Sequence, residues 1–173
     1  LKNKVKHNDV LNWDWQSYTN IKDGTLTEEQ QNVLKVFCES NVVILDAPSG
    51  TGKTSSLMAL IQMIEDYDMT YMMMSPTGKA ASRLSEQTGR PASTIHRAVL
   101  GNQLSDKDVL IIDESSMLSI DLMSMITYNS ELLDHCRLLL VGDSAQIPSI
   151  GLGRVFKDMG ESGGIPKCTL TKC

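Results

Sequence analysis

Four short apolar runs stand out along the chain, separated by segments in which apolar residues are spaced more widely. Each run is a nearly unbroken series of Val, Ile, Leu or Met, which is typical of strands buried on both faces of a parallel sheet. The runs occupy residues 42–45, 69–74, 109–112 and 137–141. A last short strand is predicted at residues 167–170, after a Gly-rich stretch from about residue 160 that has the composition of a loop.

Helical spacing fills most of the intervals between these runs. Thr27-Glu28-Glu29-Gln30 is a capping-box sequence, in which the Thr27 side chain can accept a hydrogen bond from the backbone amide of Gln30. The apolar residues that follow it form one stripe, so a helix is predicted to begin there. Further helices are predicted at residues 55–64, 79–86 and 118–128, and a short one beginning at residue 92.

Strands and helices alternate, which predicts an α/β fold with a mostly parallel sheet and helices on both faces. Ligands of such sheets bind at the carboxyl ends of the strands. Residues 1–25 show neither the helical nor the strand spacing of apolar residues, although Trp13, Trp15 and Tyr18 lie among their polar residues. We interpret them as a linker or the end of a preceding domain whose aromatic rings dock on the main body. An aromatic platform that stacks nucleic-acid bases is the alternative.

Composition narrows the class of protein. A chain of 173 residues with 41% hydrophobic and 21% charged residues suits one globular domain, and no apolar run reaches the length of a membrane span. The net charge of −5 argues against a nucleic-acid binder that works through bulk charge, so any such contact must be local. The chain begins with Leu and lacks the apolar core of a secretory signal, so we expect a piece of a longer, cytoplasmic protein.

The four cysteines fit a reducing compartment. Cys38 and Cys136 lie in apolar segments, where thiols usually pack as small hydrophobic groups. Cys168 and Cys173 lie five residues apart, and a redox pair is the alternative to two unlinked thiols.

The sequence APSGTGKT at residues 47–54 follows the first apolar run and opens a helix. This is the context of a phosphate-binding loop, in which glycines let backbone N–H groups converge on an anion at a helix N-terminus. Lys53 is expected to reach the outer phosphates, and Thr54 to offer its hydroxyl to Mg²⁺. The nucleotide-binding residues predicted from the loop are Ser49, Gly50, Thr51, Gly52, Lys53, Thr54 and Ser55.

Two further strand ends carry polar side chains suited to phosphate chemistry. Asp113 is placed to hold Mg²⁺, and the adjacent Glu114 to polarise an attacking water. Gln146, after the fourth run, could bond both the γ-phosphate and that water. The catalytic residues predicted are therefore Lys53, Asp113, Glu114 and Gln146, with a nucleoside triphosphate and Mg²⁺ as ligands, and hydrolysis is favoured over transfer to a small acceptor.

Six motifs in order resemble those of RecD-like superfamily 1 DNA helicases, the family of the exodeoxyribonuclease V alpha subunit. They are LTEEQ at residues 26–30, APSGTGKT at 47–54, SPTGKAA at 75–81, STIHR at 93–97, IDESSM at 112–117 and GDSAQIPSIG at 142–151. The resemblance covers residues 26–173 and implies the RecA-like first motor domain of an ATP-dependent 5′→3′ DNA helicase of repair or recombination. It implies single-stranded DNA, a second motor domain and other recombination subunits as partners.

The resemblance also implies roles for particular residues. Gln30 would read adenine, Lys53 would contact the phosphates, and Thr54 and Asp113 would bind Mg²⁺. Glu114 would be the catalytic base and Gln146 the γ-phosphate sensor. Single-stranded DNA would be touched by Pro76, Thr77, Thr94 and His96, through local contacts that need no basic surface.

The chain departs from the family pattern in three places. Ala47 stands where Gly is usual, at the loop position farthest from the phosphates. The stretch at residues 98–107 is too short for the duplex-splitting hairpin that is common in the family, so either the protein lacks it or residues are missing there. The motif beginning at residues 169–173 stops before an arginine finger.

No arginine replaces that finger by sequence position. Four arginines occupy helices, loops or the amino end of a strand and are expected to lie away from the phosphates; they are Arg83, Arg90, Arg97 and Arg137. Arg154 is the one arginine without a predicted place. We therefore expect residues 1–173 alone to be nearly inactive as an ATPase. Two other function classes stay open: a P-loop ATPase switch that acts on protein partners without DNA, and a binding module without catalysis.

Overall fold

A parallel sheet is the framework of the part of the chain that the structure describes. The computed structural model describes residues 10–21, 24–128, 135–146 and 153–171. Among these residues, six strands form one sheet in the order β5-β4-β6-β7-β3-β8, and each strand pairs with its neighbours in parallel. The strands are β3 (Val42–Asp46), β4 (Tyr71–Ser75), β5 (Ala92–Thr94), β6 (Val109–Ile112), β7 (Arg137–Gly142) and β8 (Lys167–Thr169).

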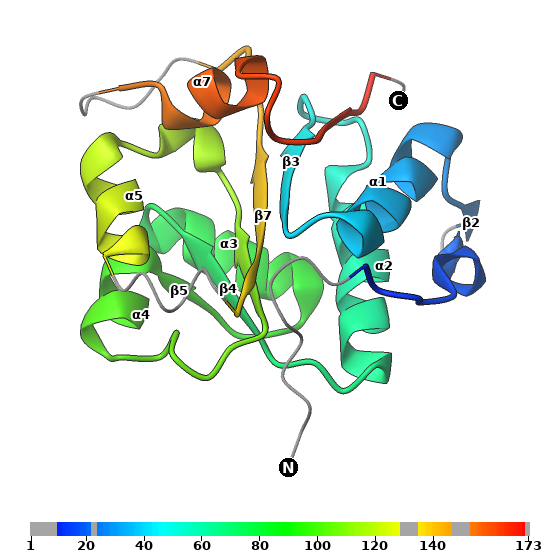
Figure 1. The fold of residues 1–173 in the computed structure, drawn as a ribbon, viewed down its shortest axis with the longest axis horizontal. Coiled ribbons are helices and arrows are strands. Elements are labelled where there is room, and N and C mark those ends of the chain that lie inside the picture. Colours follow the sequence, from blue (N-terminus) through cyan, green and yellow to red (C-terminus); the bar gives the residue numbers. More distant parts are fainter. Residues whose placement is uncertain (1–9, 22–23, 129–134, 147–152, 172–173) are drawn as a thin grey trace.

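Helices cover both faces of this sheet, as predicted. They are α1 (Glu28–Glu39), α2 (Lys53–Asp66), α3 (Gly78–Thr88), α4 (Ile95–Leu100), α5 (Ile120–Thr127) and α7 (Val155–Glu161), with a 3₁₀ turn η2 (Ser115–Met117). In Figure 1, α1 and α2 lie on one side of β3 and β7, and α4 and α5 lie on the other. Among the described residues, no helix is long and apolar enough to cross a membrane.

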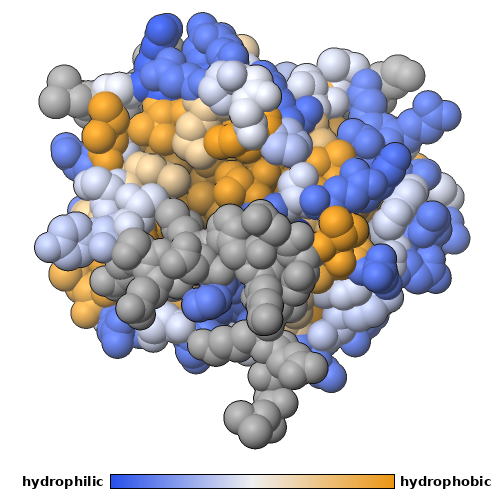
Figure 2. All heavy atoms as spheres, viewed as in Figure 1, coloured by the Kyte–Doolittle hydropathy of each residue, from blue (hydrophilic) through white to orange (hydrophobic). Residues whose placement is uncertain are grey.

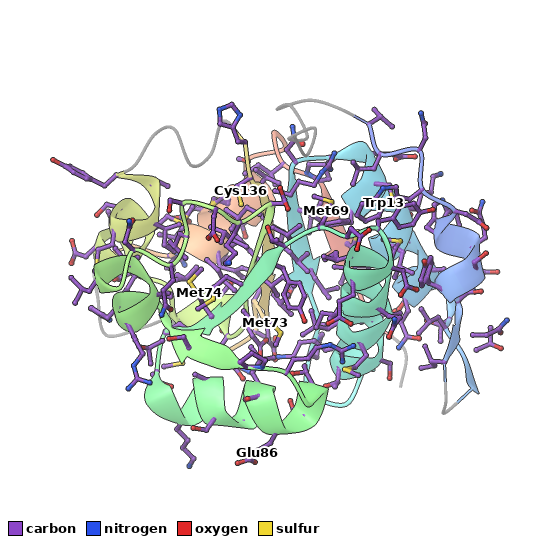
Figure 3. The ribbon with its side chains drawn as sticks, turned by 90° about the horizontal axis from the view of Figure 1, so that it is seen from below. Trp13, Met69, Met73, Met74, Glu86 and Cys136 are labelled. Atoms are coloured by element: carbon purple, nitrogen blue, oxygen red, sulfur yellow. The ribbon has the colours of Figure 1, made fainter. Side chains whose placement is uncertain are left out.

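The apolar runs divide between two cores because side chains alternate along a strand. In β6, Val109 and Ile111 join the core under α1, α2 and α3, whereas Leu110 and Ile112 join the core under α4, α5 and α7. The interior position of β4 is visible in Figure 3, where Met73 and Met74 are labelled. On the face drawn in Figure 2, hydrophobic surface is gathered in the upper part of the molecule.

The capping box at the start of α1 forms as predicted. Thr27 Oγ1 accepts a hydrogen bond from the Gln30 amide at 3.3 Å, and the Thr27 amide donates to Gln30 Oε1 at 2.9 Å. The first turn of α1 also carries Glu28 and Glu29, which complement the positive end of the helix dipole.

One prediction about the elements is wrong, and one helix was missed. Ala92 does not begin a helix: residues 92–94 form β5, which adds to the edge of β4, and α4 begins only at Ile95. The small residues of β5 give no apolar signal, so its strand conformation follows from pairing with β4. The helix α7 was not predicted, and it buries Phe156 against the sheet just before the Gly-rich loop.

Aromatic residues near the N-terminus dock on the main body, the first of the two arrangements expected for them. This segment contains the turn η1 (Trp15–Tyr18) and two short paired strands, β1 (Asn20–Ile21) and β2 (Gly24–Thr25). The ring of Trp13 stacks on Tyr67 with 4.4 Å between centroids and 8° between planes. Trp13, Trp15 and Tyr18 all pack against the core under α1 and α2.

The segment between α4 and β6 contains turns alone. Gly101 and Gln103 donate backbone hydrogen bonds to Arg97 and Ala98, and Asp108 donates to Thr70 just before β6. This described segment therefore holds no strand-separating hairpin. Cys38, Cys136 and Cys168 are buried free thiols, while Cys173 lies outside the described residues, as does its suggested pairing with Cys168.

Candidate functional site

The loop between β3 and α2 has the backbone shape that anion binding requires. Gly50 and Gly52 have φ values of +86° and +82°, in the left-handed region that favours glycine. A Cβ at Gly52 would also lie 2.0 Å from the side-chain nitrogen of Gln30. Ala47 directly follows β3, is buried, and donates its N–H to Gly142 O at 2.8 Å, so the first position of the motif extends the pairing of β3 with β7 and accommodates a methyl group.

Lys53 meets Asp113 at the carboxyl edge of the sheet. Lys53 Nζ lies 3.2 Å from Asp113 Oδ1, and the two side chains are 22% and 10% exposed. Lys53 begins α2 and Asp113 follows β6, yet β7 lies between β3 and β6. The contact therefore depends on the strand order and not on closeness in sequence.

Glu114 and Gln146 lie beside this pair. Glu114 has a left-handed backbone with φ of +55°, an uncommon conformation for a residue with a side chain and one that is concentrated at functional sites. Gln146 is held in a turn after β7. Its backbone N–H donates to Asp143 O at 3.1 Å, and its side-chain Oε1 accepts from Ser116 Oγ at 3.4 Å. Both residues line one pocket with Lys53 and Asp113.

That pocket, which we call the phosphate pocket, has a volume of about 280 Å³. It is lined by Ala47, Pro48, Ser49, Gly50, Gly52, Lys53, Thr54, Arg83, Gln87, Asp113, Glu114 and Gln146. Two predicted loop residues do not line it. Thr51 is buried, with its hydroxyl donating to Pro48 O at 2.8 Å, and Ser55 lines a neighbouring cavity of about 640 Å³ between α2 and the N-terminal segment.

The donor atoms present suit a magnesium ion. Asp113 Oδ1 is buried and, apart from its ion pair with Lys53, has no hydrogen-bond partner among the described residues, so this oxygen has capacity for a further partner. Thr54 supplies a hydroxyl oxygen in the same pocket, and Mg²⁺ prefers such hard oxygen ligands. Within the described ranges, no cluster of three or more His, Cys, Asp or Glu side chains could hold a metal alone.

Gln30 does not line the phosphate pocket, although it touches the loop. It is 8% exposed, its Nε2 donates to Gly52 O at 3.1 Å and its Oε1 accepts from the Thr27 amide. Both ends of the side-chain amide are therefore engaged within the protein. Reading adenine would require Gln30 to exchange one of these bonds.

The four residues predicted to touch DNA lie at or just after the carboxyl ends of two paired strands, β4 and β5. Thr94 ends β5 directly beside Ser75 of β4, so Pro76 and Thr77 emerge next to it at the same edge of the sheet. Thr77 and Thr94 are each the N-cap of a helix, accepting from Ala80 at 3.2 Å and from Arg97 at 3.3 Å. A capping hydroxyl still has its own hydrogen to donate.

An open groove runs beside these loops. We call it the α3 groove; it has a volume of about 420 Å³ and is lined by Gly78, Ala81, Ser82, Ser85, Glu86, Ala92, Ser93, Thr94 and Arg97. Thr94 is the one member of the predicted DNA set that lines it. His96 and Thr77 are exposed, and Pro76 is half-buried.

One placement of an arginine was wrong. Arg83 was expected to lie away from the phosphates, but it lines the phosphate pocket together with Gln87, four residues later on α3. Residues four apart share a helix face, so the spacing pairs Arg83 with Gln87. It could not show that this face of α3 turns toward the loop, because that depends on how α3 packs.

A buried carboxylate was also missed. Asp46, the last residue of β3, accepts from the amide and hydroxyl of Ser144 at 2.8 and 2.7 Å and lies 2.7 Å from Lys167 Nζ. Burial alone would raise the pKa of Asp46, but the bonds from Lys167 and Ser144 outweigh it and hold that pKa below its usual value. Asp46 thus joins the end of β3 to β8 and to the turn that carries Gln146.

The loop, the helix it opens and the acidic pair at the same sheet edge define a P-loop nucleotide-binding domain with a RecA-like sheet. A family model described as an AAA domain matches residues 25–173, and the chain belongs to that family. The comparisons also confirm the similarity to RecD-like helicases that the motifs predicted.

Curated relatives of this chain include a protein named as a DNA helicase and a protein named as a subunit of the RecBCD enzyme. It is 38% identical over 152 residues to an ATP-dependent RecD2 DNA helicase of Deinococcus radiodurans, covering 82% of this chain and 21% of that protein. It is 30% identical over 178 residues to the RecBCD enzyme subunit RecD of Mycolicibacterium smegmatis, covering 82% of this chain and 31% of the relative. The chain thus spans about a fifth to a third of their length.

A solved structure shares the fold. The Pif1 helicase from Candida albicans aligns with a TM-score of 0.64 and 20% identity, covering 84% of this chain and 39% of that one. The chain is a motor domain related to the RecD family of ATP-dependent DNA helicases.

Proposed function

We propose that this domain binds Mg²⁺-ATP and uses its hydrolysis to move a 5′→3′ DNA helicase along single-stranded DNA in repair or recombination. The observation that carries the proposal is the arrangement at one edge of the sheet. The phosphate pocket, with Lys53 3.2 Å from Asp113, opens at the same strand ends as the loops of Thr77 and Thr94. Nucleotide and DNA would thus bind to one rigid frame.

In the proposed reaction, Thr54 and Asp113 hold Mg²⁺ and Lys53 contacts the outer phosphates. The metal supplies positive charge to the phosphate oxygens when bound. Glu114 accepts a proton from a water whose oxygen attacks the γ-phosphorus, and the bond from that phosphorus to the β–γ bridging oxygen breaks. Gln146 orients the water and the γ-phosphate. The contact between Lys53 and Asp113 must lengthen when the nucleotide binds, because Lys53 then contacts phosphates and Asp113 holds Mg²⁺.

In the proposed DNA contact, Thr77 and Thr94 donate their hydroxyl hydrogens to backbone phosphates while still accepting the N–H groups that they cap. His96, exposed on the first turn of α4, adds a donor close to Thr94. With a net charge of −5, few phosphates would be neutralised, so affinity should be weak and its salt dependence shallow. We also propose a second motor domain and other recombination subunits as partners, and a cytoplasmic location.

Binding and turnover test the two halves of this proposal. Calorimetry should show that the chain binds Mg²⁺-ATP and that Lys53→Ala abolishes binding, whereas unchanged affinity in that variant would refute the phosphate loop. Fluorescence anisotropy should show that Thr77→Ala and His96→Ala weaken single-stranded DNA binding alike across base sequences. Glu86→Gln is a control in the α3 groove that should not weaken it.

Steady-state ATPase assays separate a motor from a switch that acts on proteins. We expect slow hydrolysis by this chain and fast, DNA-stimulated hydrolysis by a longer chain that continues through a second motor domain, because closing two lobes around ATP completes the site. ATP turnover by the longer chain that does not respond to single-stranded DNA would favour the switch.

A further inference from the structure

Two cationic side chains line the phosphate pocket. Arg83 and Lys53 both line the pocket, but Lys53 is paired with Asp113 at 3.2 Å. Arg83 is exposed and makes no hydrogen bond or ion pair with any other residue in the part of the chain that the structure describes. Its neighbour along the helix face, Gln87, adds an amide to the same wall of the pocket.

The net charge of the pocket becomes negative when a nucleotide enters. Without a ligand, the side chains of Lys53 and Arg83 balance those of Asp113 and Glu114. A nucleoside triphosphate brings more negative charge than one Mg²⁺ ion removes, so a cation at the wall becomes favourable. A guanidinium suits this task because its planar fork of N–H donors matches two phosphate oxygens at once.

The helix that carries Arg83 also borders the α3 groove. The N-cap of α3 is Thr77, and several of its small and polar residues, among them Ser82 and Glu86, line that groove. Figure 3 shows Glu86 projecting outward from α3. A single helix of 11 residues therefore lines both cavities, with Arg83 and Gln87 at the phosphate pocket and its first turn at the α3 groove.

We propose that Arg83 binds the phosphates of the nucleotide from within this domain, and that α3 thereby links the occupancy of the phosphate pocket to the α3 groove. The proposal rests on the proposed function, since it assigns Arg83 to the same nucleotide site. Arg83 then contributes charge from the chain's own α3, in addition to any arginine that a second domain would supply. Gln87 lies beside it as a hydrogen-bonding neighbour.

Nucleotide affinity tests the contact. Arg83→Ala should weaken Mg²⁺-ATP binding about tenfold, as expected for the loss of a hydrogen-bonded charge contact. Arg83→Lys should restore part of the affinity, and Arg83→Gln should not, because the charge carries the effect. Lys79→Ala is the matched control: it removes an exposed cation one turn earlier on α3, outside the lining of either cavity, and should leave affinity within twofold.

The outcomes separate this inference from the proposed function. If the wild-type chain binds no ATP, the proposed function fails. If it binds ATP, and Lys53→Ala abolishes binding while Arg83→Ala binds as tightly as wild type, only the role of Arg83 fails. Thermal denaturation of each variant shows whether it is folded. If Arg83→Ala does not fold, Arg83→Gln replaces it in the affinity measurement.

DNA affinity with and without nucleotide tests the linkage through α3. Single-stranded DNA affinity is measured in the presence and absence of saturating Mg²⁺-ATP, and the ratio of the two is the coupling factor. The factor should lie closer to one in Arg83→Ala than in wild type. Equal factors in the two proteins would overturn the linkage.

Discussion

Replacing Asp46 with Asn should loosen the join between β3, β8 and the turn that carries Gln146. The carboxylate is buried, with a side chain 6% exposed, and lies within 2.8 Å of three donors on Ser144 and Lys167. Asparagine preserves the volume and one acceptor, but its NH₂ group would face Lys167 and the negative charge is lost. Lys167 is 31% exposed and can turn partly into solvent, which limits the cost.

The magnitude follows from these contacts. Hydrogen bonds to charged groups contribute about 1.5 to 3 kcal/mol each, and breaking a buried ion pair costs about 3 to 5 kcal/mol. Because Lys167 keeps access to water and Asn retains one bond, we expect a loss of about 3 kcal/mol in the free energy of unfolding. For a chain of this size, that loss lowers the melting temperature by roughly 6 to 12 °C.

Urea unfolding at pH 7, followed by circular dichroism, measures the loss. Asp106→Asn is the matched control, because Asp106 pairs with Lys107 at the surface with 73% of its side chain exposed, and such pairs contribute little. If Asp46→Asn and Asp106→Asn unfold at the same urea concentration, the buried carboxylate does not hold the three segments together.

The pH dependence of the unfolding free energy supplies a second check on the role of Asp46. The pKa of Asp46 is lowered in the folded protein, so its stabilisation is complete above the unfolded value of about 3.9 and is lost as the pH falls through the lower folded value. The gap in unfolding free energy between wild type and Asp46→Asn should stay constant from pH 7 to about pH 5 and shrink below about pH 4. A gap that widened on acidification would contradict the assigned sign.

Three further predictions concern other parts of the chain. Gln30→Ala should reduce the preference for ATP over GTP, measured by competition binding; equal loss for both nucleotides would show that Gln30 only tethers the loop. Arg137→Met should destabilise the protein by about 2 to 3 kcal/mol in urea unfolding, because the buried guanidinium donates to the Phe37 and Ser40 carbonyls at the end of α1; an unchanged midpoint would argue against this. Burial raises the pKa of the Cys136 thiol to about 12, so peptide-level mass spectrometry should find its alkylation at pH 8 roughly a thousandfold slower in the folded than in the unfolded chain; fast labelling of the native protein would refute this.

Local sequence determined the elements that have a strong pattern of their own. The capping box at Thr27 predicted the start of α1, and the runs that became β3, β6 and β7 were predicted with a difference of at most one residue at either end. These predictions succeed because a cap or a continuous apolar run acts over a few neighbouring residues. The order of strand and helix then implied that Lys53, Asp113 and Gln146 would come to one edge of the sheet.

Tertiary structure alone decided which of these elements are neighbours. The strand β7 lies between β3 and β6, and the position of the Lys53–Asp113 contact follows from that order. The edge strand β5 forms because β4 offers unpaired backbone groups, since three residues, of which only Thr94 has a clear strand preference, would not form a strand alone. Such pairing joins segments that are far apart in the sequence, so no local pattern records it.

The two residues that sequence reasoning misplaced or missed follow the same rule. Arg83 on α3 resembles any solvated helical arginine until packing turns its face toward the phosphate loop. Asp46 resembles a strand-end acid until β8 brings Lys167 beside it and the turn after β7 brings Ser144. Sequence determined which side chains have the chemistry for phosphate and DNA. Only the packing of helices and the order of strands decided which charges meet, because electrostatic contacts depend on distances of a few ångströms between segments that the chain itself does not join.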